Sequence, residues 1–268
     1  MTDKNRTDQP RWAIEAEKLT KSFDDRLALR GVDLKIAPGE SVVVFGPNGA
    51  GKTTLIKLLA TIMSPSSGKI MIDGLDIKKE AEQVRRKIGV VSHNTYLYGN
   101  LTAYENLDFY RRLYDVPKGR IAEVAAMVGM DSRLHDRVST LSSGMRQRFS
   151  IARALLHNPA IILLDEPETG LDQEAISLLW TVLRRDAPLY GKVFAGRLRR
   201  QSQRDLAQPR SPAKRTVILT THNLAWGLEL ADRLFILSRG RIVFEGTKPL
   251  LDLEGLKRAY IENTGVAA

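Results

Sequence analysis

An eight-residue glycine-rich stretch constrains the fold of this chain more than any other feature. It runs from Gly46 to Thr53 and matches the pattern G-x-x-x-x-G-K-[ST]. The apolar run at residues 42–45 precedes it, and apolar residues recur at helical spacing over residues 53–63. Between a buried strand and a helix, such glycines let backbone N–H groups turn inward and form a nest for an anion. The stretch therefore predicts a phosphate-binding loop.

The chemistry expected of this loop is nucleotide binding. Lys52 is predicted to reach the β- and γ-phosphates, and the Thr53 hydroxyl is predicted to bind Mg²⁺. The alternative is an ordinary glycine turn, which the flanking strand and helix disfavour. The predicted nucleotide contacts along the stretch are Gly46, Pro47, Asn48, Gly49, Ala50, Gly51, Lys52, Thr53 and Thr54.

Two acids follow a second apolar run. Residues 161–164 are aliphatic, and Asp165 and Glu166 come directly after them. A strand that delivers an acid at its carboxyl end does so where an open α/β sheet binds ligands. We expect Asp165 to bind Mg²⁺ directly or to bind one of the ligands of the ion. We expect Glu166 to be the base that orients the attacking water. A strand end with solvated charges fits the same pattern, so the phosphate loop upstream gives the pair its weight.

Further apolar runs of strand length occur at residues 70–77, 216–220 and 234–237. Helix-like stretches separate them, and residues 94–160 are helical in pattern, which indicates crossover units and a mostly parallel sheet. The absence of cysteine excludes thiol catalysis and thiolate zinc sites. No apolar run approaches the ~18 residues of a membrane helix, so we expect a soluble protein.

Most of the net charge of +10 comes from one segment. Residues 187–215 hold eight basic residues and one acid, among prolines and glycines. The rest of the chain carries little net charge, which argues against a nucleic-acid partner. We expect the segment to be an inserted loop. Two roles stay open for it: a solvated surface loop, or contact with anionic lipid headgroups or an acidic partner.

Taken together, these motifs resemble those of the nucleotide-binding subunit of an ABC transporter, over residues 12–246. The resemblance implies an α/β P-loop NTPase fold of ABC type. Such a fold has a central mostly parallel sheet, a peripheral antiparallel sheet and a helical subdomain, here near residues 94–160. Residues 12–268 would form this single domain, with a flexible tail at residues 1–11 and the basic inserted loop at about 187–215.

A third motif of that family, L-S-G-G-Q, opens a helix and caps the γ-phosphate held by the opposite subunit. The matching stretch is Leu141-Ser-Ser-Gly-Met145, which departs from the family pattern at Ser143 and Met145. The resemblance implies phosphate contacts by Ser142, Ser143 and Gly144. A serine at a helix start presents a hydroxyl and free N–H groups to an anion, although the same serine also fits a plain N-cap.

Three further residues take roles from the resemblance. Asp172 corresponds to an acid at the dimer interface of the family. His222 follows the apolar run at 216–220 and corresponds to a histidine that hydrogen-bonds the γ-phosphate. Phe23 stands where the family places an aromatic residue that stacks on adenine, and the alternative is a core phenylalanine.

The clearest departure from the family is His93, which stands where most members have a glutamine. That glutamine senses Mg²⁺ and the attacking water, so His93 counts among the predicted magnesium and nucleotide contacts, with Asn94 as the alternative. His93 and the run at residues 100–110 resemble the ATP-binding subunit of the haem exporter of cytochrome c maturation. The stretch at 141–145 fits ABC-2 type exporters of drugs or polysaccharides equally well.

The expected function is that of an ATP-hydrolysing subunit that pairs with a second copy around two ATP–Mg²⁺ and drives a separate membrane subunit. Through that subunit the chain would lie on the cytoplasmic face of the membrane. Soluble ABC ATPases of ribosomes or DNA are disfavoured, because one phosphate loop is present and no coiled coil or cysteine module separates the motifs. A metabolic P-loop kinase would lack the motifs at 141–148 and 169–172. Each site is expected to join Lys52, Asp165, Glu166 and His222 of one copy with Ser142 and Gly144 of the other.

Overall fold

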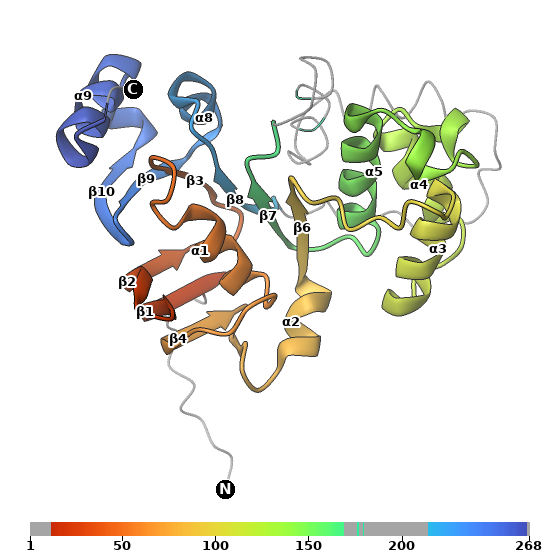
Figure 1. The fold of residues 1–268 in the computed structure, drawn as a ribbon, viewed down its shortest axis with the longest axis horizontal. Coiled ribbons are helices and arrows are strands. Elements are labelled where there is room, and N and C mark those ends of the chain that lie inside the picture. Colours follow the sequence, from red (N-terminus) through yellow and green to blue (C-terminus); the bar gives the residue numbers. More distant parts are fainter. Residues whose placement is uncertain (1–11, 169–175, 177–178, 180–213, 267–268) are drawn as a thin grey trace, which may run out of the picture.

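The computed structural model describes residues 12–168, 214–266 and the single residues Ile176 and Leu179. In this part of the chain, two β-sheets lie against each other and a group of helices extends from one side (Figure 1). The expected α/β architecture is therefore present.

The central sheet has six described strands in the order β10-β9-β3-β8-β7-β6. Every neighbouring pair is parallel except β10 with β9, which confirms the mostly parallel sheet that the sequence predicts. β3, β7 and β8 consist almost entirely of buried residues, as strands covered on both faces must. The strands are β3 (Ser41–Phe45), β6 (Ile88–Ser92), β7 (Ile161–Asp165), β8 (Thr216–Thr220), β9 (Arg233–Ser238) and β10 (Arg241–Thr247).

The peripheral sheet has four described strands in the order β2-β1-β4-β5, and all its pairs are antiparallel. The sequence predicts one strand over residues 70–77, but the chain turns within it. Asp73 and Gly74 adopt positive φ angles of 50° and 79°, so a tight turn separates two strands. The strands are β1 (Ile14–Phe23), β2 (Arg26–Ile36), β4 (Ser67–Ile72) and β5 (Leu75–Asp76).

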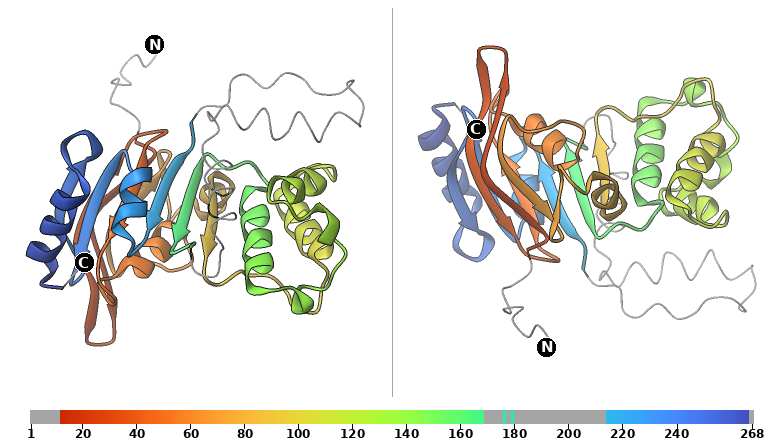
Figure 2. Two further views of the ribbon diagram at one scale, coloured as in Figure 1. Left: turned by 90° about the horizontal axis from the view of Figure 1, so that it is seen from above. Right: turned by 90° about the horizontal axis from the view of Figure 1, so that it is seen from below.

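The helical side consists of α3 (Ala103–Tyr114), α4 (Arg120–Met127) and α5 (Ser143–Leu155). Figure 2 shows these helices grouped at one end of the molecule, beyond β6. The helical pattern begins at residue 94, but the first helix begins only at Ala103. A capping box sets this start: the Glu105 N–H donates to the Thr102 hydroxyl at 3.1 Å, and the Thr102 N–H donates to the Glu105 carboxylate at 2.8 Å.

The other helices are shorter or lie near the carboxyl terminus. The sequence predicts a helix over residues 53–63, but α1 ends at Leu59, and Thr61 beyond it has a φ of 56°. None of the helices that the structure describes combines the length and the apolar character needed to span a bilayer. The remaining elements are α1 (Lys52–Leu59), α2 (Ala81–Lys87), α8 (Leu224–Leu230) and α9 (Leu253–Thr264), with 3₁₀ turns at Asp131–Arg133, Val138–Thr140 and Lys248–Leu250.

Alternate residues of β3 point into two separate cores. Val43 and Phe45 belong to the core that the helical side, α8 and α9 share with the central sheet. Val42 and Val44 belong to the core that α1 and the peripheral sheet share with it. Packing on both faces fixes the central sheet, and its parallel register brings the carboxyl ends of β3, β7 and β8 to one edge.

The basic segment predicted at residues 187–215 lies outside the described residues as far as residue 213. Its last two residues belong to the folded part. Lys214 Nζ lies 2.7 Å from the Asp232 carboxylate, and the buried Arg215 side chain donates to Asn158 Oδ1 at 3.1 Å. These two charges therefore hold the start of β8 in place.

Candidate functional site

Two glycines hold the loop after β3 against neighbouring backbone. A Cβ on Gly46 would lie 2.2 Å from the Leu237 carbonyl oxygen, and a Cβ on Gly51 would lie 2.6 Å from that of Ala28. Gly51 also has a φ of 110°, which favours glycine, and it is the N-cap of α1. Neither position accepts a side chain without a backbone shift, so the sequence sets the curvature of the loop.

Lys52 reaches back across this loop from the first turn of α1. Its side chain is 5% exposed, and Nζ donates to the Gly46 carbonyl at 2.7 Å and to the Pro47 carbonyl at 3.3 Å. The same nitrogen lies 3.3 Å from Glu166 Oε1, which comes from the end of β7. The predicted phosphate-binding lysine and the predicted base thus meet at one point.

Asp165 is the centre of a cluster of oxygen atoms at the sheet edge. Its Oδ1 accepts a hydrogen bond from the Thr53 hydroxyl at 3.2 Å and another from the Thr220 hydroxyl at 2.8 Å. Glu166 follows with a φ of 45°, an uncommon conformation for glutamate, and its N–H donates to the Thr220 carbonyl at 3.0 Å. The structure therefore brings Thr53 and Asp165 together, as a shared Mg²⁺ site requires.

A cavity of about 490 Å³ lies along the phosphate loop. Phe23 is 45% exposed at its margin, so the alternative of a core phenylalanine is wrong. An exposed ring beside the loop has the position that stacking on a nucleotide base needs, and stacking stays a prediction. The residues that line the cavity are Phe23, Arg26, Ala28, Asn48, Gly49, Ala50, Gly51, Lys52, Thr53, Thr54 and Glu166.

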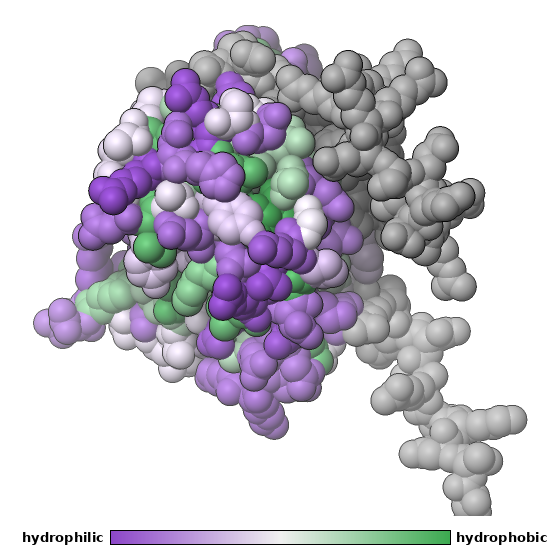
Figure 3. Space-filling view, turned by 90° about the vertical axis from the view of Figure 1, so that its right-hand side faces the viewer, coloured by the Kyte–Doolittle hydropathy of each residue, from purple (hydrophilic) through white to green (hydrophobic). Residues whose placement is uncertain are grey.

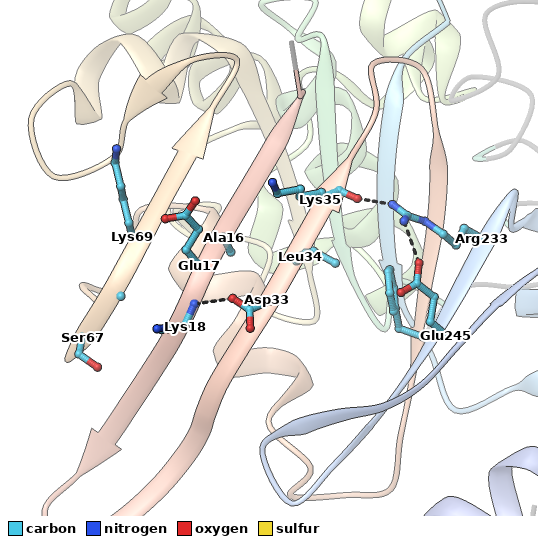
Figure 4. Close-up of a pocket in the computed structure, with 12 residues that line it drawn as sticks. Ala16, Glu17, Lys18, Asp33, Leu34, Lys35, Ser67, Lys69, Arg233 and Glu245 are labelled. Carbon is cyan, nitrogen blue, oxygen red and sulfur yellow. Dashed lines mark hydrogen bonds and ion pairs between the residues drawn. The ribbon is translucent and has the colours of Figure 1, made fainter. Parts of the chain in front are cut away.

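A larger cavity of about 900 Å³ is lined by the peripheral sheet and by strands β9 and β10 (Figure 4). The Lys18 backbone N–H donates to Asp33 at 2.8 Å, and the Arg233 guanidinium pairs with the Glu245 carboxylate at 2.9 Å. The Arg233–Glu245 pair neutralises two of the charges along this cavity. The predicted site residues that the structure describes lie elsewhere.

β8 brings His222 to the edge that carries Asp165, because Asp165 is paired with Thr220 in the register of β7 and β8. His222 is exposed, and the buried Thr221 before it donates its hydroxyl hydrogen to Glu168 Oε1 at 2.5 Å. Burial raises the pKa of Glu168, although the Thr221 hydrogen bond and nearby His222 act in the opposite direction. The motifs do not single out Glu168, but its place in the acidic run after β7 is a signal that could have found it.

The predicted phosphate contacts at residues 142–144 lie apart from the loop. Ser142 is the N-cap of α5 and accepts a hydrogen bond from the Met145 N–H at 3.2 Å, while Ser143 is exposed. Figure 1 shows α5 on the far side of β6 from α1. Ser142 is thus an N-cap, and the same helix start still presents N–H groups outward.

The end of β6 carries the predicted residues His93 and Asn94, and both are exposed. Buried Gln147 of α5 donates to the Ser92 carbonyl at 3.3 Å and so ties this strand end to α5. The choice between His93 and Asn94 stays open. Asp172 lies outside the described residues.

Comparison with known proteins shows the family to which this chain belongs. A family model described as ABC transporter matches residues 29–169, more than half of the chain. The chain belongs to the ABC transporter ATP-binding family. A second model, that of an AAA domain, matches residues 137–226.

Named members of the family are similar over most of their length. The ABC transporter ATP-binding protein NatA of Bacillus subtilis is 35% identical over 82% of this chain and 81% of its own. The daunorubicin resistance ATP-binding protein DrrA3 of Streptomyces coeruleorubidus is 33% identical over 90% of this chain and 70% of its own. A solved ATP-binding subunit of an ABC transporter is 26% identical, with a TM-score of 0.72 over 95% of both chains.

Membership of the ABC family settles the coarse predictions. The ABC-type fold is confirmed, and the protein is an ATP-binding ATPase coupled to transport. A similar solved structure, 25% identical with a TM-score of 0.70, is a dimeric ATP-binding cassette after hydrolysis, bound to ADP and phosphate.

Proposed function

We propose that this ABC protein is the ATP-hydrolysing subunit of an exporter, and that two copies close around two ATP–Mg²⁺ to drive a separate membrane subunit. One observation carries the proposal. Lys52, Asp165 and Glu166 converge on the phosphate loop, whereas Ser142 lies at the start of α5, apart from that loop in the same chain. A second copy, related by a two-fold axis, would supply the missing serine to each loop.

Lys52 and Thr53 would hold the nucleotide. The backbone carbonyls of the loop now hold the Lys52 ammonium in place, so its charge is positioned before a phosphate arrives. Mg²⁺ prefers oxygen ligands in octahedral geometry, and the Thr53 hydroxyl and Asp165 carboxylate are neighbouring oxygens of that kind. His93 would approach from the end of β6, and Mg²⁺ would neutralise charge on the phosphates.

Glu166 would act as the base that orients the attacking water. Its ion pair with Lys52 suggests how it is released for that task. A γ-phosphate that binds Lys52 competes with Glu166 for the same ammonium, because both are anions at hydrogen-bonding distance. The carboxylate is then free to accept a proton from water, while His222 contacts the γ-phosphate from the adjacent strand end.

The opposite subunit would contribute Ser142, Ser143 and Gly144 at the N-terminus of α5, and Asp172 at the dimer interface. The positive end of the α5 dipole and its free N–H groups suit a γ-phosphate. The Ser142 hydroxyl is the acceptor of its own capping bond and still has a hydrogen to donate. Each site is then complete only in the dimer.

The membrane subunit would dock on the helical side. Figure 3 looks onto this side and shows apolar residues among polar ones. Tyr98, Phe109 and Leu113 are exposed there, and the Tyr98 and Phe109 rings pack edge to face with centroids 5.8 Å apart. Exposed apolar residues in a group are typical of a surface that binds a partner. The protein would thus be peripheral on the cytoplasmic face of the membrane.

Export of a drug-like or other small compound by an ABC-2 type exporter is the favoured activity. Relatives are named for linearmycin resistance, Nod factor export and daunorubicin resistance. Haem export rests on His93 and residues 100–110 alone, and we keep it as the alternative. The lipid contact predicted for the basic segment would concern residues before Lys214, because Lys214 and Arg215 are engaged in the fold.

Complementation between two inactive variants tests the composite site. Lys52→Ala removes the lysine of the phosphate loop. Ser142→Asp places a negative charge opposite the γ-phosphate, while it preserves the N-cap of α5. Each variant alone is expected to lose ATPase activity. When both are mixed, half of the two-fold dimers carry one intact site, so up to about a quarter of the activity returns. Ser142→Asn is the matched control, because it caps the helix without charge. A mixture that stays inactive, while both variants bind each other, would contradict the shared site.

A further inference from the structure

Glu168 holds the loop that carries His222. Its Oε1 accepts the Thr221 hydroxyl hydrogen at 2.5 Å, and the same hydroxyl oxygen accepts a hydrogen bond from the Asn223 N–H at 3.0 Å. The Thr221 N–H in turn lies 3.4 Å from the Val44 carbonyl of β3. Thr221, directly before His222, is therefore held both to the segment after β7 and to β3, and Asn223, directly after His222, is held to Thr221.

The second carboxylate oxygen of Glu168, Oε2, has a different environment. Oε2 is buried and has no hydrogen-bond partner among the described residues. An unpaired buried acceptor is unfavourable, and an ionised one more so. His222 is close enough to affect the pKa of Glu168, and Glu166 acts on it as well. Among the described residues, the charged groups that act on the Glu168 carboxylate are thus His222 and Glu166.

We infer that Glu168 is a positioning residue for His222: Oε1 fixes the loop through Thr221, and Oε2 accepts an imidazole N–H when His222 turns to the γ-phosphate. The inference rests on the role of His222 under the proposed function. A neutral imidazole carries one N–H, so it cannot donate to Glu168 and to a phosphate at once. An imidazolium carries two N–H groups, which can serve both acceptors at once.

Glu168→Gln separates the two oxygens of this carboxylate. The amide carbonyl can still accept from Thr221, but the amide nitrogen that replaces the other oxygen cannot accept from an imidazole N–H. We expect kcat for ATP hydrolysis to fall about 10-fold, as the loss of one charge-assisted hydrogen bond predicts, with the KM for ATP nearly unchanged. Glu262→Gln on α9, an exposed carboxylate, is the matched control and should leave both constants unchanged.

A double-mutant cycle separates positioning from a general effect. His222→Ala should lower kcat further than Glu168→Gln, and the double variant should be no worse than His222→Ala. Losses that multiply, or a normal kcat for Glu168→Gln beside an impaired His222→Ala, would overturn the inference. A normal kcat for His222→Ala would instead overturn the role proposed for His222.

If Glu168→Gln unfolds, Thr221→Val should lower kcat and Thr221→Ser should restore it. Equal rates for those two variants would overturn the inference as well.

Discussion

The two halves of the candidate site differ in how far one chain completes them. At the phosphate loop, Lys52 contacts two loop carbonyls and Glu166, and Thr53 contacts Asp165. At the start of α5, Ser142 binds the Met145 N–H of its own helix, and Ser143 is exposed. The loop half is internally bonded, whereas the α5 half has exposed Ser142 and Ser143 at its helix start.

This difference follows from where the two halves lie in the sheet. The loop half is built at the carboxyl ends of parallel strands that are buried on both faces, and its Lys52 and Asp165 side chains are buried. The α5 half is built at a helix end beyond the edge strand β6. Under the proposed function, the loop half carries the chemistry and the α5 half meets the second copy.

The largest effect is expected from the loop half, at Glu166. Glu166→Gln keeps the size of the side chain and its acceptor for Lys52 but removes the base. Loss of general-base catalysis costs about 10²–10⁴-fold in rate, so ATP hydrolysis should fall by that factor. ATP should then hold the two copies together, and size-exclusion chromatography with ATP should show a dimer. The matched control is Glu82→Gln on α2, an exposed carboxylate. A variant with wild-type hydrolysis would remove Glu166 from the role of base.

Sequence predicts the loop half well because its chemistry is local. The loop, the strand before it and the helix after it lie within about twenty consecutive residues, and the acid pair directly follows its own strand. The parallel sheet follows from apolar runs separated by helices. The turn that splits residues 70–77 is less visible, because it depends on the positive φ of Asp73 beside Gly74.

Contacts between distant residues could not be predicted in this way. The Glu168 hydrogen bond to Thr221 joins residues that are 53 positions apart, and only the register of β7 and β8 brings them together. Arg215 belongs to a basic run in sequence, yet it is buried against the end of α5, where Asn158 accepts its hydrogen bond. From composition alone, an arginine in such a run is expected at the surface.

Acid is expected to weaken the junction between the two halves, which is the contact between β6 and the segment after α5. His157 follows α5, its Nε2 lies 2.9 Å from the Ile88 carbonyl of β6, and burial lowers its pKa from 6.5 to about 4. Between these values the unfolded chain binds a proton that the folded chain does not, so stability falls as pH falls. From pH 7 to pH 5 the free energy of unfolding should drop by about 2 kcal/mol from this group.

Urea denaturation at both pH values measures this effect. His157→Gln retains a hydrogen-bonding side chain without titration, and its stability should lose that part of the pH dependence. His135→Gln, at an exposed histidine, is the matched control and should keep the wild-type pH dependence. Identical pH dependence in His157→Gln and wild type would show that the junction is not the acid-sensitive element.

The smallest effect is expected at the margin of the loop half, where Phe23 is exposed beside the cavity. Stacking of a base on an aromatic ring is worth about 1–3 kcal/mol, and the lower end suits a ring with one open face. Phe23→Ala should therefore raise the KM for ATP about 5-fold with little change in kcat. Because stacking tolerates any base, the KM for GTP should rise by a similar factor, and Phe23→Trp should preserve both values. Phe109→Ala removes an equally exposed ring from the helical side and should leave both KM values unchanged. Equal KM values for Phe23→Ala and Phe109→Ala would mean that the base binds without Phe23, and that the loop half recognises only the phosphates.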